Sequence, residues 1–146
     1  MSKFSLFVAL IASISSVAFA GQMHTLTGTL GDEELVAHYG TQTSQDVVTI
    51  GGRPYRILSQ GSDSIEAKRL VTENNIATID ETLVINLDAK LVNEIIMDPV
   101  KALDGFHFAN SETFSCEAGS NALVFLGDNL HQPYPLNAYC VTLRNM

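Results

Sequence analysis

The sequence contains no tryptophan, only two cysteines and only eight basic residues among its 146 positions. Sixteen acidic residues give it a formal net charge of −8 at pH 7. A chain this acidic repels the phosphates of nucleic acids and of anionic lipids, so we expect no nucleic-acid partner. Without tryptophan, and with only four tyrosines, it also offers few rings on which a sugar could stack. The composition therefore disfavours nucleic-acid and carbohydrate binding.

Motifs for catalysis and for cofactor binding are also absent. There is no Gly-x-Ser-x-Gly turn for a serine nucleophile and no glycine-rich phosphate loop followed by lysine. The four histidines, His24, His38, His107 and His131, lack the spacing that places two metal ligands on one helix face. We therefore predict no cofactor and no metal site, and a non-enzymatic protein is favoured over an enzyme.

Residues 1–20 have the pattern of a secretory signal peptide. Lys3 precedes an apolar run at 4–12, and 18–20 (Ala-Phe-Ala) has the small-x-small form of a cleavage site. The apolar run is too short to span a bilayer, so we expect no membrane insertion. We predict export to the periplasm or outside the cell, with 21–146 as a single mature domain. Loss of Lys3 leaves 7 basic and 16 acidic residues, a net charge of −9.

Cys116 and Cys140 are the only cysteines, so a disulfide between them has no alternative connectivity. Exported proteins meet oxidising conditions, and we therefore predict a structural Cys116–Cys140 bond. Closing a loop of about 25 residues contributes roughly 3–4 kcal/mol in the chain-entropy account. A reactive cysteine is disfavoured, because Glu117 next to Cys116 opposes the thiolate and Cys140 lies within a predicted strand.

The clearest local element is a hairpin, in which two β-rich runs at 47–50 and 55–58 surround a pair of glycines. Pro54 cannot donate a ladder hydrogen bond, which places it at a strand start or on a sheet edge. Arg53 and Arg56 suggest an anion site, but an exposed strand face with solvated charges is the favoured interpretation.

Two short helices are predicted between the strands. Asp63 and Glu66 resemble a capping box, and the apolar residues within 67–71 then fall on one helix face. Asp88 predicts the N-cap of a second helix with an apolar stripe, and Pro99 predicts its end.

The remaining pattern is dominated by strands. Alternating or β-rich runs predict further strands at 24–30, 83–88, 113–118, 123–126 and 138–143. Residues 35–39 fit either a strand or one helical turn, so the chain has six to eight strands. We predict an α+β, mainly antiparallel β domain, either a small barrel or a two-layer sheet with two short helices and one disulfide. Cys140 points away from the apolar face of its strand, which places the disulfide between layers or on the outer side of the sheet.

Function is predicted mainly by exclusion. We expect an exported, soluble binding or inhibitor-like module that acts on a protein or an envelope component. The irregular, proline-containing segment 128–137 is the candidate binding loop, and His131 and Tyr134 are its candidate contact residues. The alternatives are a small exported hydrolase that uses His107 with neighbouring acids, and a structural envelope subunit with an unpaired edge strand. The sequence leaves the partner and the oligomeric state open.

Overall fold

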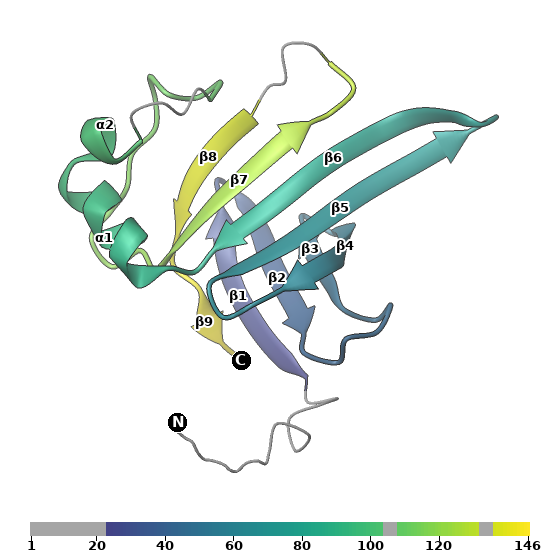
Figure 1. The fold of residues 1–146 in the computed structure, drawn as a ribbon, viewed down its shortest axis with the longest axis horizontal. Coiled ribbons are helices and arrows are strands. Elements are labelled where there is room, and N and C mark those ends of the chain that lie inside the picture. The colour runs from purple at the N-terminus through teal and green to yellow at the C-terminus, as the bar shows by residue number, and fades with distance from the viewer. Residues whose placement is uncertain (1–22, 104–107, 132–135) are drawn as a thin grey trace.

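One antiparallel sheet dominates the molecule (Figure 1). The computed structural model describes residues 23–103, 108–131 and 136–146, and the predicted signal peptide at 1–20 lies outside them. In this part of the chain nine strands pair in the order β8-β7-β6-β5-β4-β3-β2-β1-β9. They are β1 (His24–Leu30), β2 (Glu33–Tyr39), β3 (Val47–Ile50), β4 (Arg53–Gln60), β5 (Ser64–Glu73), β6 (Ile76–Asn86), β7 (Ala122–Asp128), β8 (Leu136–Val141) and β9 (Arg144–Asn145). The predicted fold class, mainly antiparallel β with two short helices and one disulfide, is confirmed.

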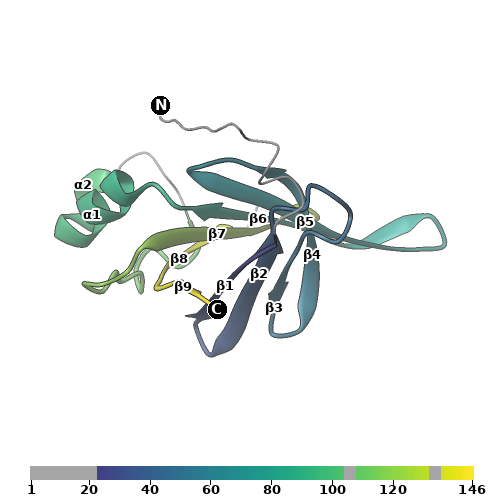
Figure 2. The ribbon, with the colours of Figure 1, turned by 90° about the horizontal axis from the view of Figure 1, so that it is seen from below.

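The sheet curls into a half-barrel, as the view along its edge shows (Figure 2). Strands β1 to β8 pair in chain order, and β9 returns to pair with β1 at the opposite edge from β8. Thr142 and Leu143 therefore link the two edges of the sheet. A Cβ atom at Gly28 of β1 would lie 2.8 Å from Leu143 Cδ2, so glycine is what allows this close approach.

The main hydrophobic core lies on the concave side of the half-barrel. Alternate residues of the strands point to this side, as the period of two requires. The largest fully buried side chains of this core are Leu35, Ile50, Tyr55, Ile65, Leu83 and Ile85. The predicted hairpin at 47–50 and 55–58 is confirmed as β3 and β4, and 35–39 is a strand.

Both helices lie in the connection between β6 and β7. Helix α1 (Ala89–Met97) begins at the predicted N-cap Asp88, whose carboxylate accepts a backbone hydrogen bond from the first turn at 3.0 Å. Pro99 ends α1 as predicted, but it also begins α2 (Pro99–Ala102), which the sequence did not predict. Neither helix in the described part of the chain is long and apolar enough to cross a membrane.

A second apolar cluster covers the outer face of β7 and β8. Val92 and Ile95 of α1 pack with Leu123 of β7 and Ala138 of β8, so β7 is buried on both faces. Cys140 belongs to this cluster, whereas its apolar neighbours in β8 face the main core. The disulfide therefore lies on the outer side of the sheet, which was one of its two predicted positions.

The helix predicted from Asp63 onward is wrong, because this segment forms β5. Ile65 points into the main core, whereas Leu70 is 56% exposed on the other face. Over so few residues an apolar face with helical spacing also fits a strand, and pairing with β6 decides between them. Asn74 and Asn75 have positive φ angles of 53° and 63° and form the β5–β6 turn.

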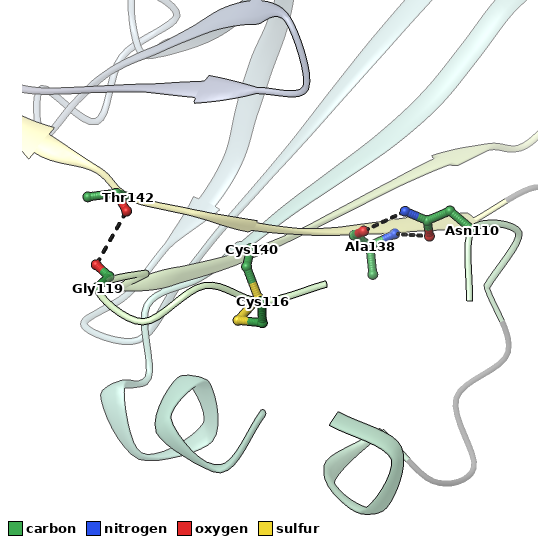
Figure 3. Close-up of a disulfide and its surroundings, with 6 residues drawn as sticks. All are labelled: Asn110, Cys116, Gly119, Ala138, Cys140 and Thr142. Atoms are coloured by element: carbon green, nitrogen blue, oxygen red, sulfur yellow. Dashed lines mark hydrogen bonds between the residues drawn. A yellow bond between two sulfur atoms is a disulfide. The ribbon is translucent and has the colours of Figure 1, made fainter. Parts of the chain in front are cut away.

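The strand predicted at 113–118 is also wrong, since this segment is irregular. It lies beside β8, to which the Cys116–Cys140 disulfide attaches it with an S–S distance of 2.03 Å (Figure 3). Nearby, Asn110 donates to the Ala138 carbonyl oxygen at 2.8 Å and accepts from the Ala138 backbone nitrogen at 3.0 Å. A side-chain amide thus satisfies backbone groups of the edge strand β8 in place of a further neighbouring strand.

Candidate functional site

The predicted binding loop is only partly described. His131 is exposed, and its Nδ1 atom lies 2.5 Å from Asp128 Oδ2. A hydrogen bond from the Leu130 backbone nitrogen lowers the pKa of Asp128, and the bond to His131 adds to the effect. Tyr134, the other candidate contact residue, lies outside the described residues. The loop therefore remains a prediction, with His131 engaged in a local turn.

The described histidines do not converge on one site. His24 stacks beside Tyr39 with ring centroids 5.3 Å apart, and His38 Nδ1 lies 3.0 Å from Thr25 Oγ1. In the described part of the chain, no three metal-ligating side chains form a group that could hold an ion. His107, the residue on which the hydrolase alternative depends, lies outside the described residues.

A polar network closes one end of the main core. Arg53 donates two hydrogen bonds to Glu33, from Nη1 at 2.6 Å and from Nη2 at 3.0 Å. The hydrogen bonds from Arg53 hold the pKa of Glu33 below its ordinary value. The hydroxyl of the fully buried Tyr55 donates to Glu81 Oε1 at 2.8 Å, and burial raises the pKa of this tyrosine. These groups satisfy one another, so the network explains how charged residues border the core.

Strand alternation separates the two arginines of β4. Arg53 shares the inner face with Tyr55, whereas Arg56 is exposed on the outer face. There Arg56 stands opposite Val47 of β3 and Lys68 of β5 in the sheet register. The sequence interpretation of two solvated charges on one face is therefore wrong for Arg53.

The outer face of β3, β4 and β5 forms a shallow groove, which we call the outer groove. It is lined by apolar and basic side chains, namely Val47, Pro54, Arg56, Leu58, Lys68 and Leu70. Leu58 and Leu70 are 55% and 56% exposed, which is unusual for large apolar residues within strands of a sheet. Among the residues that the structure describes, no helix covers this face, in contrast to the outer face of β7 and β8 (Figure 1).

The outer groove concentrates positive charge on an acidic protein. Three of the seven basic residues that follow the predicted signal peptide, Arg56, Lys68 and Arg69, lie at this groove. Arg56 and Lys68 face each other directly, and like charges at opposed positions repel. Lys68 forms an ion pair with Asp80 at 3.3 Å. Among the described residues no hydrogen bond or ion pair involves the Arg56 side chain, so its guanidinium is free to bind an anion.

A buried carboxylate borders one end of the outer groove. Asp46 is 1% exposed and accepts hydrogen bonds from the backbone nitrogens of Gly40, Thr41 and Gln42 at 3.2, 3.1 and 2.9 Å. The hydroxyl of Thr41 and the amide of Gln60 also donate to it, the latter at 2.7 Å. Burial alone raises its pKa, but these hydrogen bonds outweigh burial and lower it. Asp46 thus fixes the loop beside the groove and has no capacity left for a ligand.

Sequence reasoning missed the outer groove because it assigned β5 to a helix. With β5 read as a strand, the outward residues Lys68 and Leu70 fall beside Arg56 of β4. The available signal was the alternation of Ile65 and Ala67 with charged residues, which continues to Lys68. The β-bulge that leaves Leu58 out of the β4–β5 pairing has no comparable signal in the sequence.

Comparison with known proteins adds no assignment to this geometry. No protein-family model matches the chain, and no curated protein and no solved structure matches it either. The function of the outer groove is therefore inferred from its own residues.

Proposed function

We propose that the chain is an exported, non-enzymatic binding or inhibitor-like module whose outer groove receives an acidic, partly apolar segment of another protein. The observation that supports this most strongly is the free guanidinium of Arg56, which stands opposite Lys68. A carboxylate from a partner relieves the repulsion between these cations and forms a charge-assisted hydrogen bond. Leu58 and Leu70 then bury apolar side chains of the same segment.

The charge distribution favours a protein partner over other anions. The net charge of −8 repels extended polyanions such as nucleic acids and anionic membranes. At physiological ionic strength, however, fields are screened within about 8 Å, so a short acidic segment is attracted by the groove alone. A partner with few carboxylates among apolar residues fits both conditions.

Export is part of the proposal. The pattern at 1–20 supports a signal peptide, and the disulfide on the outer side of the sheet supports an oxidising compartment. An inhibitor-like role is the special case in which the bound segment belongs to an enzyme. The loop with His131 and Tyr134 is proposed as a further contact of the same partner.

Peptide selection with the purified mature chain tests the groove. A displayed random peptide library should yield extended sequences with at least one acidic residue among apolar ones. In fluorescence anisotropy, Arg56→Ala should weaken a selected peptide by about tenfold, the usual cost of truncating an interface arginine. Arg144→Ala is the matched control, because Arg144 is exposed on β9 outside the groove.

Two results would contradict the proposal. One is a selected set without enrichment in acidic residues. The other is equal binding by the Arg56→Ala and Arg144→Ala variants. Replacing Tyr134 with alanine tests the loop separately, since a change in affinity there is expected only if the loop contacts the same peptide.

One observation favours a second candidate, a structural envelope subunit. Thr72 and Glu73 extend β5 beyond the position opposite Arg53, where β4 begins. An unpaired edge is a site at which another strand can add.

A further inference from the structure

Asp80 lies on β6, the strand next to β5, and stands beside the outer groove without lining it (Figure 1). In the sheet register Asp80 is opposite Leu70 of β5, and Thr82 is opposite Lys68. Lys68 and Asp80 are therefore diagonal neighbours on the outer face, a spacing that long side chains bridge. The Lys68 Nζ atom lies 3.3 Å from Asp80 Oδ1. The ammonium of Lys68 is thus neutralised from outside the groove.

The connection between β7 and β8 holds the Asp80 carboxylate in place. The Asn129 side-chain amide donates to Asp80 Oδ1 at 3.0 Å and to the Thr82 hydroxyl at 2.7 Å. The Asn129 backbone nitrogen donates to the Asp80 carbonyl oxygen at 2.8 Å. These bonds order the Asp80 side chain, which is only 21% exposed. An ion pair with an ordered carboxylate costs less side-chain entropy than an ion pair between two mobile groups.

Arg56 is the cation that this arrangement leaves available. It stands opposite Lys68 across the β4–β5 ladder, and no carboxylate in the described part of the chain pairs with it. Arg69, the third basic residue at the groove, alternates to the inner face, where Glu81 of β6 stands opposite it. The outer face of the groove therefore carries one neutralised cation beside one available cation.

The difference between these two cations bears on which segments the groove accepts. We propose that Asp80 is a specificity-determining residue, which occupies Lys68 so that the outer groove prefers a segment with a single carboxylate, bound at Arg56. The apolar side chains next to that carboxylate lie against Leu58 and Leu70. This inference rests on the proposed function of the groove, and it names the class of segment that the groove binds.

A second carboxylate on the partner gains nothing while Asp80 is charged. It has to displace Asp80 from Lys68, which exchanges one surface ion pair for another and leaves the Asp80 carboxylate without a cation. The protein also repels each additional negative charge, because its own net charge is −8. Without the charge of Asp80, Lys68 becomes available, and an ion pair with the second carboxylate should raise the affinity by about two- to fivefold.

Peptide selection on the Asp80→Asn chain tests this inference. The new amide oxygen still accepts from Asn129, so the connection keeps its anchor, whereas the charge that holds Lys68 is lost. A displayed random library should yield peptides with one acidic residue on the parent chain and peptides with two on Asp80→Asn. In fluorescence anisotropy, the two-carboxylate peptides should bind Asp80→Asn about two- to fivefold more tightly than they bind the parent. A damaged fold weakens binding, so this gain separates a role in specificity from a structural role.

Two controls locate the effect at Lys68. Glu34→Gln makes the same change of net charge on β2, outside the groove, and it should leave the selected peptides and their affinities unchanged because distant surface charges are screened. In a Lys68→Met background, Asp80→Asn should no longer tighten the two-carboxylate peptides, because the gain depends on the ammonium.

The outcomes separate this inference from the proposed function. A parent chain that selects no acidic peptides contradicts the proposed function, and this inference falls with it. Selection of the same single-carboxylate peptides with equal affinity by the parent and by Asp80→Asn overturns this inference alone. A parent chain that already prefers two carboxylates overturns it as well, as does an equal gain in Glu34→Gln or a gain that persists without Lys68.

Discussion

Two regions of the same sheet differ in how far their outer faces are covered. At β7 and β8 the outer face is covered by α1, and the edge of β8 is blocked by Asn110 and by the Cys116–Cys140 disulfide. At β4 and β5 the outer face carries exposed leucines, and residues 69–80 of β5 and β6, which we call the arm, pair in the sheet only with each other. Natural sheets usually protect their edges against unwanted pairing. The exposed leucines of β4 and β5 support the proposal that this face is the binding surface.

The covered region uses a large share of the chain. The connection between β6 and β7 runs over 87–121, and it supplies both helices and the irregular segment beside β8. Without this connection β8 would be an exposed edge and Leu123 would lack a layer to pack against. Stability is thus expected to be concentrated at β7 and β8, while the β4–β6 side contributes little beyond the main core.

The largest effect should come from deleting matched isoleucines in the two regions. Ile95→Ala leaves a cavity between α1 and the sheet, because Ile95 is fully buried. It should lower the free energy of unfolding by about 2–5 kcal/mol. Ile76→Ala at the arm, where the side chain is 67% exposed, should change it by no more than about 0.5 kcal/mol. Urea unfolding followed by circular dichroism measures both, and equal costs would refute the contrast.

Removing the disulfide should weaken the covered region selectively. Replacing both cysteines by serine removes a link across 24 positions of sequence and should cost about 3 kcal/mol. Hydrogen exchange should show faster exchange at 108–117 and in β8, with little change in the arm. Uniformly faster exchange across all strands would instead indicate that the two regions unfold as one unit.

The open region should depend on the hydrogen bonds of Asp46. Asp46→Asn replaces a charged acceptor and should cost about 2 kcal/mol at neutral pH. Since folding lowers the pKa of Asp46 below 3.8, its stabilisation is complete above 3.8 and is lost as pH falls through the folded pKa. Unfolding free energies measured against pH should therefore converge for the parent chain and Asp46→Asn below 3.8. Parallel curves would contradict the role of this carboxylate.

A smaller effect is expected from uncovering the β8 edge. Asn110→Ala removes two hydrogen bonds to Ala138 and should cost about 1 kcal/mol. It should also increase association through β8 in light scattering. Asn145→Ala on β9 is the control, because its exposed side chain makes no such bonds. An Asn110→Ala chain as stable as the control would show that the disulfide alone holds this segment.

Much of the fold was predictable from local pattern. The β3–β4 hairpin followed from two glycines between β-rich runs, and α1 followed from Asp88 and Pro99. The errors at Asp63 and at 113–118 share a cause, because a short apolar pattern fits several structures until long-range pairing selects one. For the candidate site, sequence reasoning identified Arg56 as a candidate charge, but it missed Lys68 and Leu70 beside it.

The sequence by itself determined the antiparallel class, the single disulfide pair and the main helix, because turn residues, cysteine count and capping act over a few positions. Tertiary structure alone decided that β9 returns to β1 and that Arg53 and Arg56 face opposite sides of the sheet. It also decided that β5 extends further along the sheet than β4. These outcomes depend on strand register and on the length of neighbouring strands, which are fixed by contacts between residues far apart in the chain. The outer groove and the projecting arm belong to this second group.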